Sequence, residues 1–172
     1  MTSSHSCKPA ILQWIRAHIP ATARVLDVGA GWGTYARLLP EYSRIEAVEV
    51  WKAYVDRFEL RRLYSIVHVA DALSFLATCQ PYDLIILGDV LEHFALADAQ
   101  LLLERCRTKA KALIVSVPYL YHQGAIFDNP WEIHQQSDLT REVFQARYPD
   151  LELLCEEGGL SAWTWTRSTL PA

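Results

Sequence analysis

The sequence predicts an α/β fold in which helices cover both faces of a doubly wound, mostly parallel, seven-stranded sheet. Short apolar runs alternate with longer helical patterns between residues 24 and 117, as expected for strand–helix–strand units. The runs LIIL and LIV are apolar throughout, which indicates strands that are buried on both faces. Gly158 and Gly159 separate the last two runs, so we expect a C-terminal hairpin with one strand antiparallel to the rest.

The first half of the chain begins with a helix and then builds four strands. Apolar residues recur at helical spacing over residues 8–19, and Pro20 ends that pattern. Helical patterns between the strands run to Leu39, to Leu60 and over a short stretch after residue 70. The four strands are expected at residues 24–28, 44–50, 65–70 and 82–88.

The second half of the chain continues this pattern and then departs from it. A helix is expected over residues 96–106, and the strand 112–117 ends at Pro118, which has no amide hydrogen to donate to a sheet. Residues 118–138 follow neither periodicity, and a helix resumes over residues 140–147. The hairpin strands are expected at residues 151–157 and 161–167.

Length and composition limit the class of protein. A chain of 172 residues with 51% hydrophobic and 21% charged residues is expected to form one domain with its own core. Its net charge of −4 lacks the basic excess of nucleic-acid binders. The four cysteines contain no CxxC pair, so neither a disulfide framework nor a zinc site is expected. No apolar run is long enough to span a membrane and the N-terminus is polar, which favours a cytoplasmic protein.

A glycine-rich loop follows the first strand, in the segment VLDVGAGWGT at residues 25–34. Its glycines allow a tight turn and a close approach of a ligand to backbone amides at a helix start. Glu49 ends the next strand, twenty positions after Gly29, where an acid that binds ribose hydroxyls is expected. The two features together predict a site for a nucleoside-like cofactor.

The spacing of the glycines separates two classes of cofactor. A dinucleotide loop reads G-x-G-x-x-G, with its third glycine where this chain has Thr34, whereas this loop reads G-x-G-x-G. Asp27 beside the loop would repel a pyrophosphate but suits a cationic cofactor. S-adenosylmethionine is such a cofactor, and a nicotinamide dinucleotide is the weaker alternative.

With these motifs, residues 20–166 resemble the class I S-adenosylmethionine-dependent methyltransferase family, which has a Rossmann-like fold. VADAL, which contains Asp71, and YDLIILGDVLEH, which contains Gly88 and Asp89, extend the resemblance. It implies an in-line transfer of a methyl group to an oxygen, nitrogen or carbon nucleophile, with S-adenosylhomocysteine as product. A non-catalytic module or partner subunit that binds the same cofactor is the alternative of a different class.

The resemblance also implies which residues bind the cofactor. Glu49 would hold the ribose and Asp71 the edge of the adenine, while Trp51 stacks on the adenine or packs elsewhere. Asp71 and Asp89 have a second interpretation, because an acid at a strand end often caps the following helix. The implied set is Asp27, Gly29, Ala30, Gly31, Gly33, Glu49, Val50, Trp51, Asp71, Ala72, Gly88 and Asp89.

The methyl acceptor is expected near residues 118–138, because so long a connection is usually functional or disordered and this one is rich in aromatic residues. The residues expected to contact it are Tyr119, Tyr121, His122 and Trp131, unless they simply pack on the sheet. The expected catalytic residues are His93, His134 and Asp89, with either histidine accepting the acceptor's proton.

We expect no metal, because His93, His122, Glu132 and His134 match no compact ligand spacing. The expected partner is a small-molecule acceptor, with neither nucleic acid nor membrane bound, and the chain acts as a monomer or homodimer. The single expected domain, 1–172, divides into a leader and helix (1–20), a cofactor-binding core (21–117), an acceptor loop (118–138) and a C-terminal helix and hairpin (139–172).

Overall fold

The computed structural model describes residues 6–167, so the first five residues of the expected leader and residues 168–172 lie outside the described residues. The strands are β1 (Val25–Val28), β2 (Ile45–Glu49), β3 (Ile66–Val69), β4 (Tyr82–Gly88), β5 (Ala110–Pro118), β6 (Glu152–Glu157) and β7 (Leu160–Thr166). The α-helices are α1 (Lys8–His18), α2 (Thr34–Leu38), α3 (Lys52–Arg57), α4 (Ala72–Thr78), α5 (Leu96–Lys109) and α6 (Arg141–Arg147). Three short 3-10 turns are η1 (Leu60–Arg62), η2 (Leu91–His93) and η3 (Pro130–Glu132).

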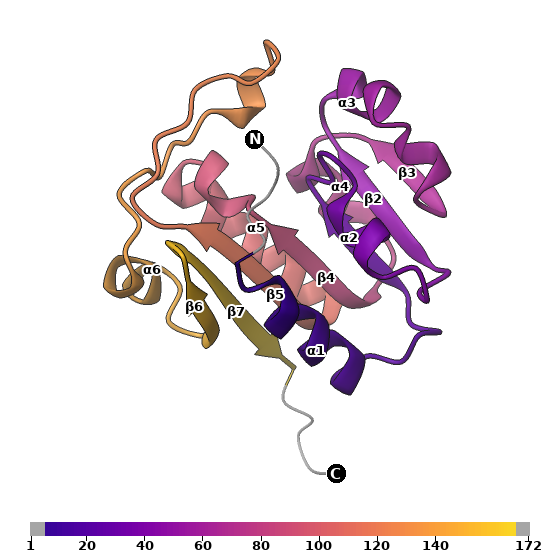
Figure 1. The fold of residues 1–172 in the computed structure, drawn as a ribbon, viewed down its shortest axis with the longest axis horizontal. Coiled ribbons are helices and arrows are strands. Elements are labelled where there is room, and N and C mark those ends of the chain that lie inside the picture. The colour runs from indigo at the N-terminus through magenta and orange to yellow at the C-terminus, as the bar shows by residue number, and fades with distance from the viewer. Residues whose placement is uncertain (1–5, 168–172) are drawn as a thin grey trace.

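The strands form one seven-stranded sheet in the order β3-β2-β1-β4-β5-β7-β6 (Figure 1). Strands β1 to β5 pair in parallel, and β7 pairs antiparallel with both β5 and β6. The predicted fold class and the C-terminal hairpin are therefore confirmed. Among the described helices, none has the length and apolar character needed to cross a membrane.

Several predicted boundaries are wrong by one to three residues. The helix expected to reach Leu60 ends at Arg57, because Glu59 adopts a left-handed backbone conformation with φ 51°. Strand β5 extends to Pro118, which lies opposite Leu160 of β7. A proline is tolerated there because the last residue of a strand need not donate to the ladder.

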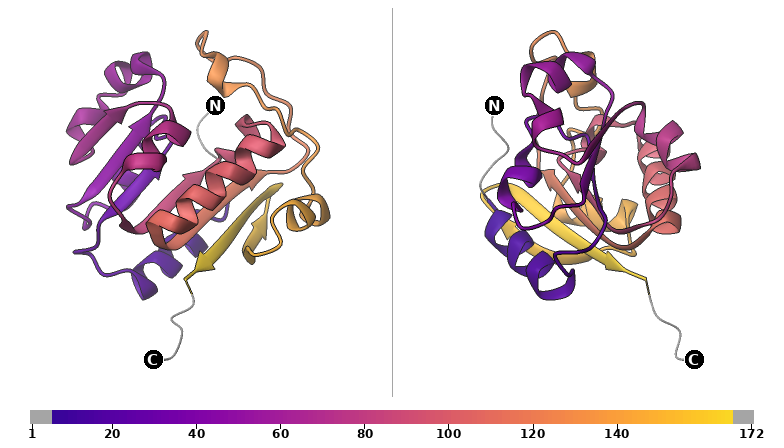
Figure 2. Two further views of the ribbon diagram at one scale, coloured as in Figure 1. Left: turned by 180° about the vertical axis from the view of Figure 1, so that it is seen from behind. Right: turned by 90° about the vertical axis from the view of Figure 1, so that its right-hand side faces the viewer.

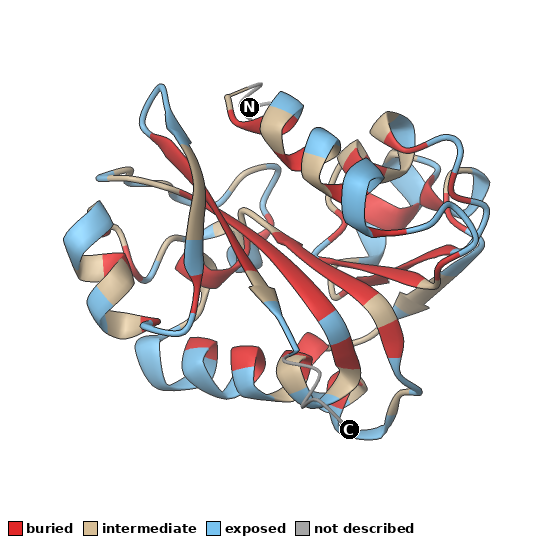
Figure 3. Cartoon of the chain, turned by 90° about the horizontal axis from the view of Figure 1, so that it is seen from below, coloured by how far each residue is buried: buried red, intermediate tan, exposed pale blue. Residues whose placement is uncertain are grey.

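Two apolar cores flank the sheet. Helices α4, α5 and α6 cover one face, whereas α1, α2 and α3 lie on the other (Figure 2). Successive β4 residues alternate between the cores, since Leu84 packs with α1 and Ile85 packs with α5. The burial on both faces that the run LIIL predicts is thus confirmed, and the buried residues concentrate on the central strands (Figure 3).

The start of α1 lies against the hairpin at the other end of the sequence. The Sγ atoms of Cys7 and Cys155 are 2.6 Å apart, and the Cys7 amide donates to Oε2 of Glu157 at 3.2 Å. All four cysteines are free thiols. The sequence pattern shows these two cysteines only as isolated residues, because their proximity depends on the docking of α1.

The side chain of Glu46 in β2 bonds to residues of β3 and β4 and to Arg24, which directly precedes β1. Its Oε1 accepts from Nε of Arg24 at 2.7 Å, and its Oε2 lies 3.0 Å from both Nε2 of His68 and the hydroxyl of Tyr82. Burial alone would raise the pKa of Glu46, but the hydrogen bonds from Arg24, His68 and Tyr82 lower it. The ionised carboxylate therefore stabilises the sheet on the side away from the strands' carboxyl ends.

Replacing this carboxylate should produce a stability loss that depends on pH. We expect Glu46→Gln to lower the free energy of unfolding at pH 7 by about 1–3 kcal/mol, the usual value of hydrogen bonds to a charged group. Because the folded pKa is lowered, the loss is complete above the usual glutamate range and shrinks as the pH falls through the folded pKa. Urea unfolding at several pH values measures it, with the exposed Glu104→Gln as control. A difference that stays constant or grows on acidification contradicts the assignment.

Candidate functional site

One cavity of about 570 Å³ lies at the carboxyl ends of the central strands. Strand order reverses between β1 and β4, with β2 and β3 on one side and β5 on the other, and ligands of open α/β sheets bind at such a point. Of the twelve expected cofactor residues, Gly33 and Trp51 lie outside the cavity wall. The ten that line it are Asp27, Gly29, Ala30, Gly31, Glu49, Val50, Asp71, Ala72, Gly88 and Asp89.

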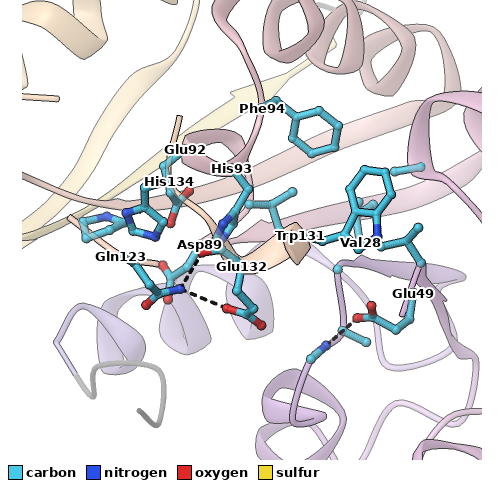
Figure 4. A pocket seen from close by; sticks show the side chains of 18 of the residues that line it. Val28, Glu49, Asp89, Glu92, His93, Phe94, Gln123, Trp131, Glu132 and His134 are labelled. Carbon is cyan, nitrogen blue, oxygen red and sulfur yellow. Dashed lines mark hydrogen bonds between the residues drawn. The ribbon is translucent and has the colours of Figure 1, made fainter. Parts of the chain in front are cut away.

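Glu49 is fixed in place by two backbone amides. Its Oε2 accepts from the amide of Gly31 at 3.0 Å (Figure 4), and its Oε1 accepts from the amide of Trp51 at 2.8 Å. Burial raises the pKa of this carboxyl, while the two amides act in the opposite direction. A carboxylate has acceptor capacity for about four donors, so further donors such as adjacent hydroxyls can still bind.

Asp27 is buried beneath the glycine loop and is not the free negative charge that the sequence suggests. The hydroxyl of Tyr64 donates to its Oδ2 at 2.5 Å. Burial raises the pKa of Asp27 to about 7, although Tyr64 and Lys8 act to lower it. Near pH 7 the group is therefore divided between its neutral and charged forms, which weakens the argument from charge repulsion.

Lys8 does not line the cavity, but it contacts Tyr35 in the cavity wall, and the sequence does not reveal this contact. It begins α1 but is only 4% exposed, and its Nζ donates to the hydroxyl of Tyr35 at 3.0 Å. Burial alone would lower its pKa, but Tyr35, Asp89 and Asp27 raise it overall. A lysine in a polar leader is normally solvated, so only the docking of α1 onto the sheet places this cation near the two acids.

Asp71 and Asp89 differ in the roles that the structure gives them. Asp71 caps α4, because its Oδ1 accepts from the amide of Ser74 at 2.8 Å, yet the residue also lines the cavity. Asp89 does not cap η2, whose N-cap residue is Val90. Instead, its Oδ1 accepts from the hydroxyl of Ser116 at 2.7 Å, and its backbone is left-handed with φ 59°. A left-handed conformation at a residue other than glycine is strained and common at functional sites.

The two expected catalytic histidines meet across the cavity from Glu49. The rings of His93 and His134 lie 4.7 Å apart in an edge-to-face arrangement, beside the buried Glu92 (Figure 4). Burial lowers the pKa of His93 to about 4, and the neighbouring His134 adds to that effect. Burial also lowers the pKa of His134. Both rings are therefore neutral at pH 7, with a nitrogen lone pair that can accept a proton or bind a ligand.

Residues 118–138 cover the cavity and reach the opposite side of the cleft. The hydroxyl of Tyr54 in α3 donates to the carbonyl of Ile126 at 3.2 Å. The next residue, Phe127, has its ring centre 3.7 Å from the guanidinium carbon of Arg57 and 6.2 Å from the ring of Trp32. This segment therefore spans from β5 to α3.

The expected acceptor residues separate into two groups. Tyr119, Tyr121 and Trp131 line the cavity, whereas His122 is exposed and lies outside its wall. Sequence reasoning also missed Tyr35, Glu92 and Gln123, which line the cavity. Gln123 donates through Nε2 to the carbonyl and to Oε2 of Glu132, both at 2.9 Å. An isolated glutamine or tyrosine carries no pattern that could have identified it.

One family model matches this chain. The family described as "Methyltransferase domain" matches residues 26–112, about half of the chain. No match was found among curated protein sequences.

Several solved structures are similar in fold. A SAM-dependent methyltransferase from Archaeoglobus fulgidus is 14% identical, with a TM-score of 0.66 over 92% of this chain and 94% of its own. Magnesium protoporphyrin IX methyltransferase (ChlM) from Synechocystis PCC 6803, with bound SAM, is 14% identical, with a TM-score of 0.66 over 93% of this chain and 77% of its own. CalS10 from Micromonospora echinaspora, a SAM-bound amino pentose methyltransferase, is 16% identical, with a TM-score of 0.67 over 93% of this chain and 89% of its own. At these identities the likeness shows a shared fold.

The glycine loop offers a matched pair of variants that separates packing from backbone strain. A Cβ at Gly33, where φ is +74°, would lie 2.6 Å from Cδ1 of Leu63, whereas one at Gly31, where φ is +51°, would meet nothing nearer than 3.7 Å. We expect Gly31→Ala to cost about 1–2 kcal/mol of left-handed strain. Gly33→Ala should lose about 1–3 kcal/mol more, because it also overpacks η1. Urea unfolding measures both, and equal losses would show that Gly33 does not serve packing.

Proposed function

This chain belongs to the methyltransferase domain family, and on that premise we propose that it transfers the methyl group of S-adenosylmethionine to a small-molecule acceptor. The observation that carries the proposal is Glu49, whose buried carboxylate is held at the cavity wall by the amides of Gly31 and Trp51. A preset pair of carboxylate oxygens suits the two adjacent hydroxyls of a ribose. The similar structures of ChlM and CalS10 contain SAM, which supports the same donor here.

The rest of the donor fits the cavity around Glu49. We place the adenine against Val50 and Ala72, with its edge toward Asp71, since these residues line the wall that follows β2 and β3. The methionine part lies along Gly29 to Gly31 and toward Gly88 at the end of β4. Lys8 is a buried cation near this end, through its contact with Tyr35, and its charge favours the ionised forms of Asp27 and Asp89. In this placement Gly33 and Trp51 act through packing and backbone position.

The acceptor binds between Asp89 and the covering segment 118–138. This part of the cavity contains neutral imidazoles and aromatic rings, and the segment closes it toward α3. A cavity of this size suits a small molecule. The net charge of −4 disfavours a nucleic acid. CalS10 is described as an amino pentose methyltransferase, which is consistent with an acceptor of this size class.

The chemistry is one displacement at the methyl carbon. A nucleophilic atom of the acceptor forms a bond to that carbon while the carbon–sulfur bond breaks, and the sulfonium becomes the neutral thioether of S-adenosylhomocysteine. Alignment of the two reactants in a mostly apolar cavity supplies much of the acceleration. Asp89, His93 and His134 are the polar side chains that orient the acceptor and receive its proton.

Titration with S-adenosylhomocysteine tests the proposed donor site. We expect the wild-type chain to bind this product, and Glu49→Ala to weaken binding by about tenfold or more, because two hydrogen bonds to a charged group are lost. The exposed Glu104→Ala on α5 is the control and should bind like wild type. Calorimetry measures all three. Binding of NAD in place of S-adenosylhomocysteine, or equal affinity in the Glu49 and Glu104 variants, would refute the assignment.

A further inference from the structure

Glu92 lies in the cavity wall as a buried acid with no partner. It is 1% exposed, and neither of its carboxylate oxygens has a hydrogen-bond partner within the described residues. Burying a carboxyl without a hydrogen bond is costly, so buried polar groups are nearly always satisfied by protein, water or a ligand. The acids Asp89 and Glu132 make an unpaired anion still less favourable, and the positive charge of Lys8 only partly offsets them. A bound positive charge is the partner that this position lacks.

Two imidazoles lie beside Glu92 and have free nitrogens. Nδ1 of His93 is buried and has no hydrogen-bond partner within the part of the chain that the structure describes. Nδ1 of His134 lies 2.8 Å from the carbonyl oxygen of Tyr121. A carbonyl only accepts, so this nitrogen carries the hydrogen and leaves Nε2 with a lone pair. Metal-binding histidines are commonly oriented by such a bond to a backbone carbonyl.

Backbone contacts hold these groups together although His134 is far along the chain from Glu92. The carbonyl of Glu92 accepts from the amides of Gln135 and Gln136 at 2.8 and 3.0 Å. The side chain of Gln136 donates to the carbonyl of Leu91 at 2.8 Å. The covering segment is thus fixed to η2 next to His134. This arrangement positions the side chains before any ligand binds.

We propose that Glu92, His93 and His134 bind one divalent transition-metal cation, such as Zn²⁺, Mn²⁺ or Fe²⁺, on the acceptor side of the cavity (Figure 4). One ligand atom from each residue lies within 4.8 Å of the others. Ligands about 2.0–2.2 Å from a common ion are about 3–3.5 Å apart, so small side-chain rotations complete the site. Two imidazoles and a carboxylate are ligands that these metals accept, and they leave coordination positions open.

The open coordination positions indicate which class of acceptor the site takes. This inference rests on the proposed methyl transfer. A cation facing the acceptor would bind a hydroxyl oxygen and lower its pKa. The hydroxyl proton passes to water, the oxygen forms a bond to the methyl carbon, and the carbon–sulfur bond breaks to give the thioether. The acceptor is therefore a hydroxyl compound. When the cation is bound, His93 and His134 act as its ligands, and water takes the proton that they would receive without it. The proposal therefore departs from the expectation that no metal binds.

Metal titration of the chelator-treated full chain tests the proposal. We expect wild type to bind one equivalent of Zn²⁺ or Mn²⁺ in calorimetry, and Glu92→Gln and His134→Ala each to weaken binding by about 100-fold or more. His18→Ala, which removes an exposed histidine of α1, is the matched control and should bind like wild type. Thermal unfolding without metal checks that the variants fold, and Glu92→Gln should be at least as stable as wild type because it removes an unpaired acid.

Two outcomes would overturn the metal site. The first is that wild type binds no metal, which would leave Glu92 as a neutral acid; the second is that all the variants bind metal equally. Titration of the same proteins with S-adenosylhomocysteine separates this failure from failure of the proposed function. If the chain binds the product but no metal, the methyltransferase proposal stands and the metal site is rejected. If the chain binds metal but not the product, the proposed donor site is rejected.

Discussion

Parallel pairing of β1 with both β2 and β4 is the constraint on which the site depends. The pairing brings Asp27 level with Ala47 and Ile86, so three strands end at the same edge of the sheet. The glycine loop, Glu49 and Gly88 all lie at that edge, although they are distant in sequence. The apolar cores on both faces hold these strand ends in register, and the cavity exists because the helices diverge where the strand order reverses.

The cavity wall combines two kinds of polar environment. On the donor side, acids are satisfied within the protein, since Glu49 accepts from two amides and Asp27 accepts from Tyr64. On the acceptor side, Glu92 and Nδ1 of His93 have no partner among the described residues. Satisfied groups stabilise a fixed shape, whereas unsatisfied buried groups stabilise the folded chain only once a ligand arrives. The donor side of the proposed site therefore has a preset shape, whereas the acceptor side has buried polar groups that a ligand could satisfy.

Local patterns predicted the strands, and ten of the twelve expected cofactor residues line the cavity. Apolar runs give strands, and the spacing of Gly29 and Glu49 depends only on the length of one strand–helix–strand unit, so both could be found without coordinates. The position of Lys8 depends on how α1 docks, and the approach of His134 to Glu92 depends on the path of the covering segment. Gly33 carries the same signal as its neighbours in the loop, yet its contacts are with Leu63 and Leu60. Residue patterns do not encode such tertiary contacts.

A crystal structure of the chain with bound S-adenosylhomocysteine tests the central claim most directly, because it locates the donor within the cavity. The account predicts that the ribose hydroxyls bind the Glu49 carboxylate and that the sulfur lies toward Gly88 and Asp89, facing His93 and His134. An empty cavity at saturating ligand, or a ribose bound away from Glu49, would contradict it.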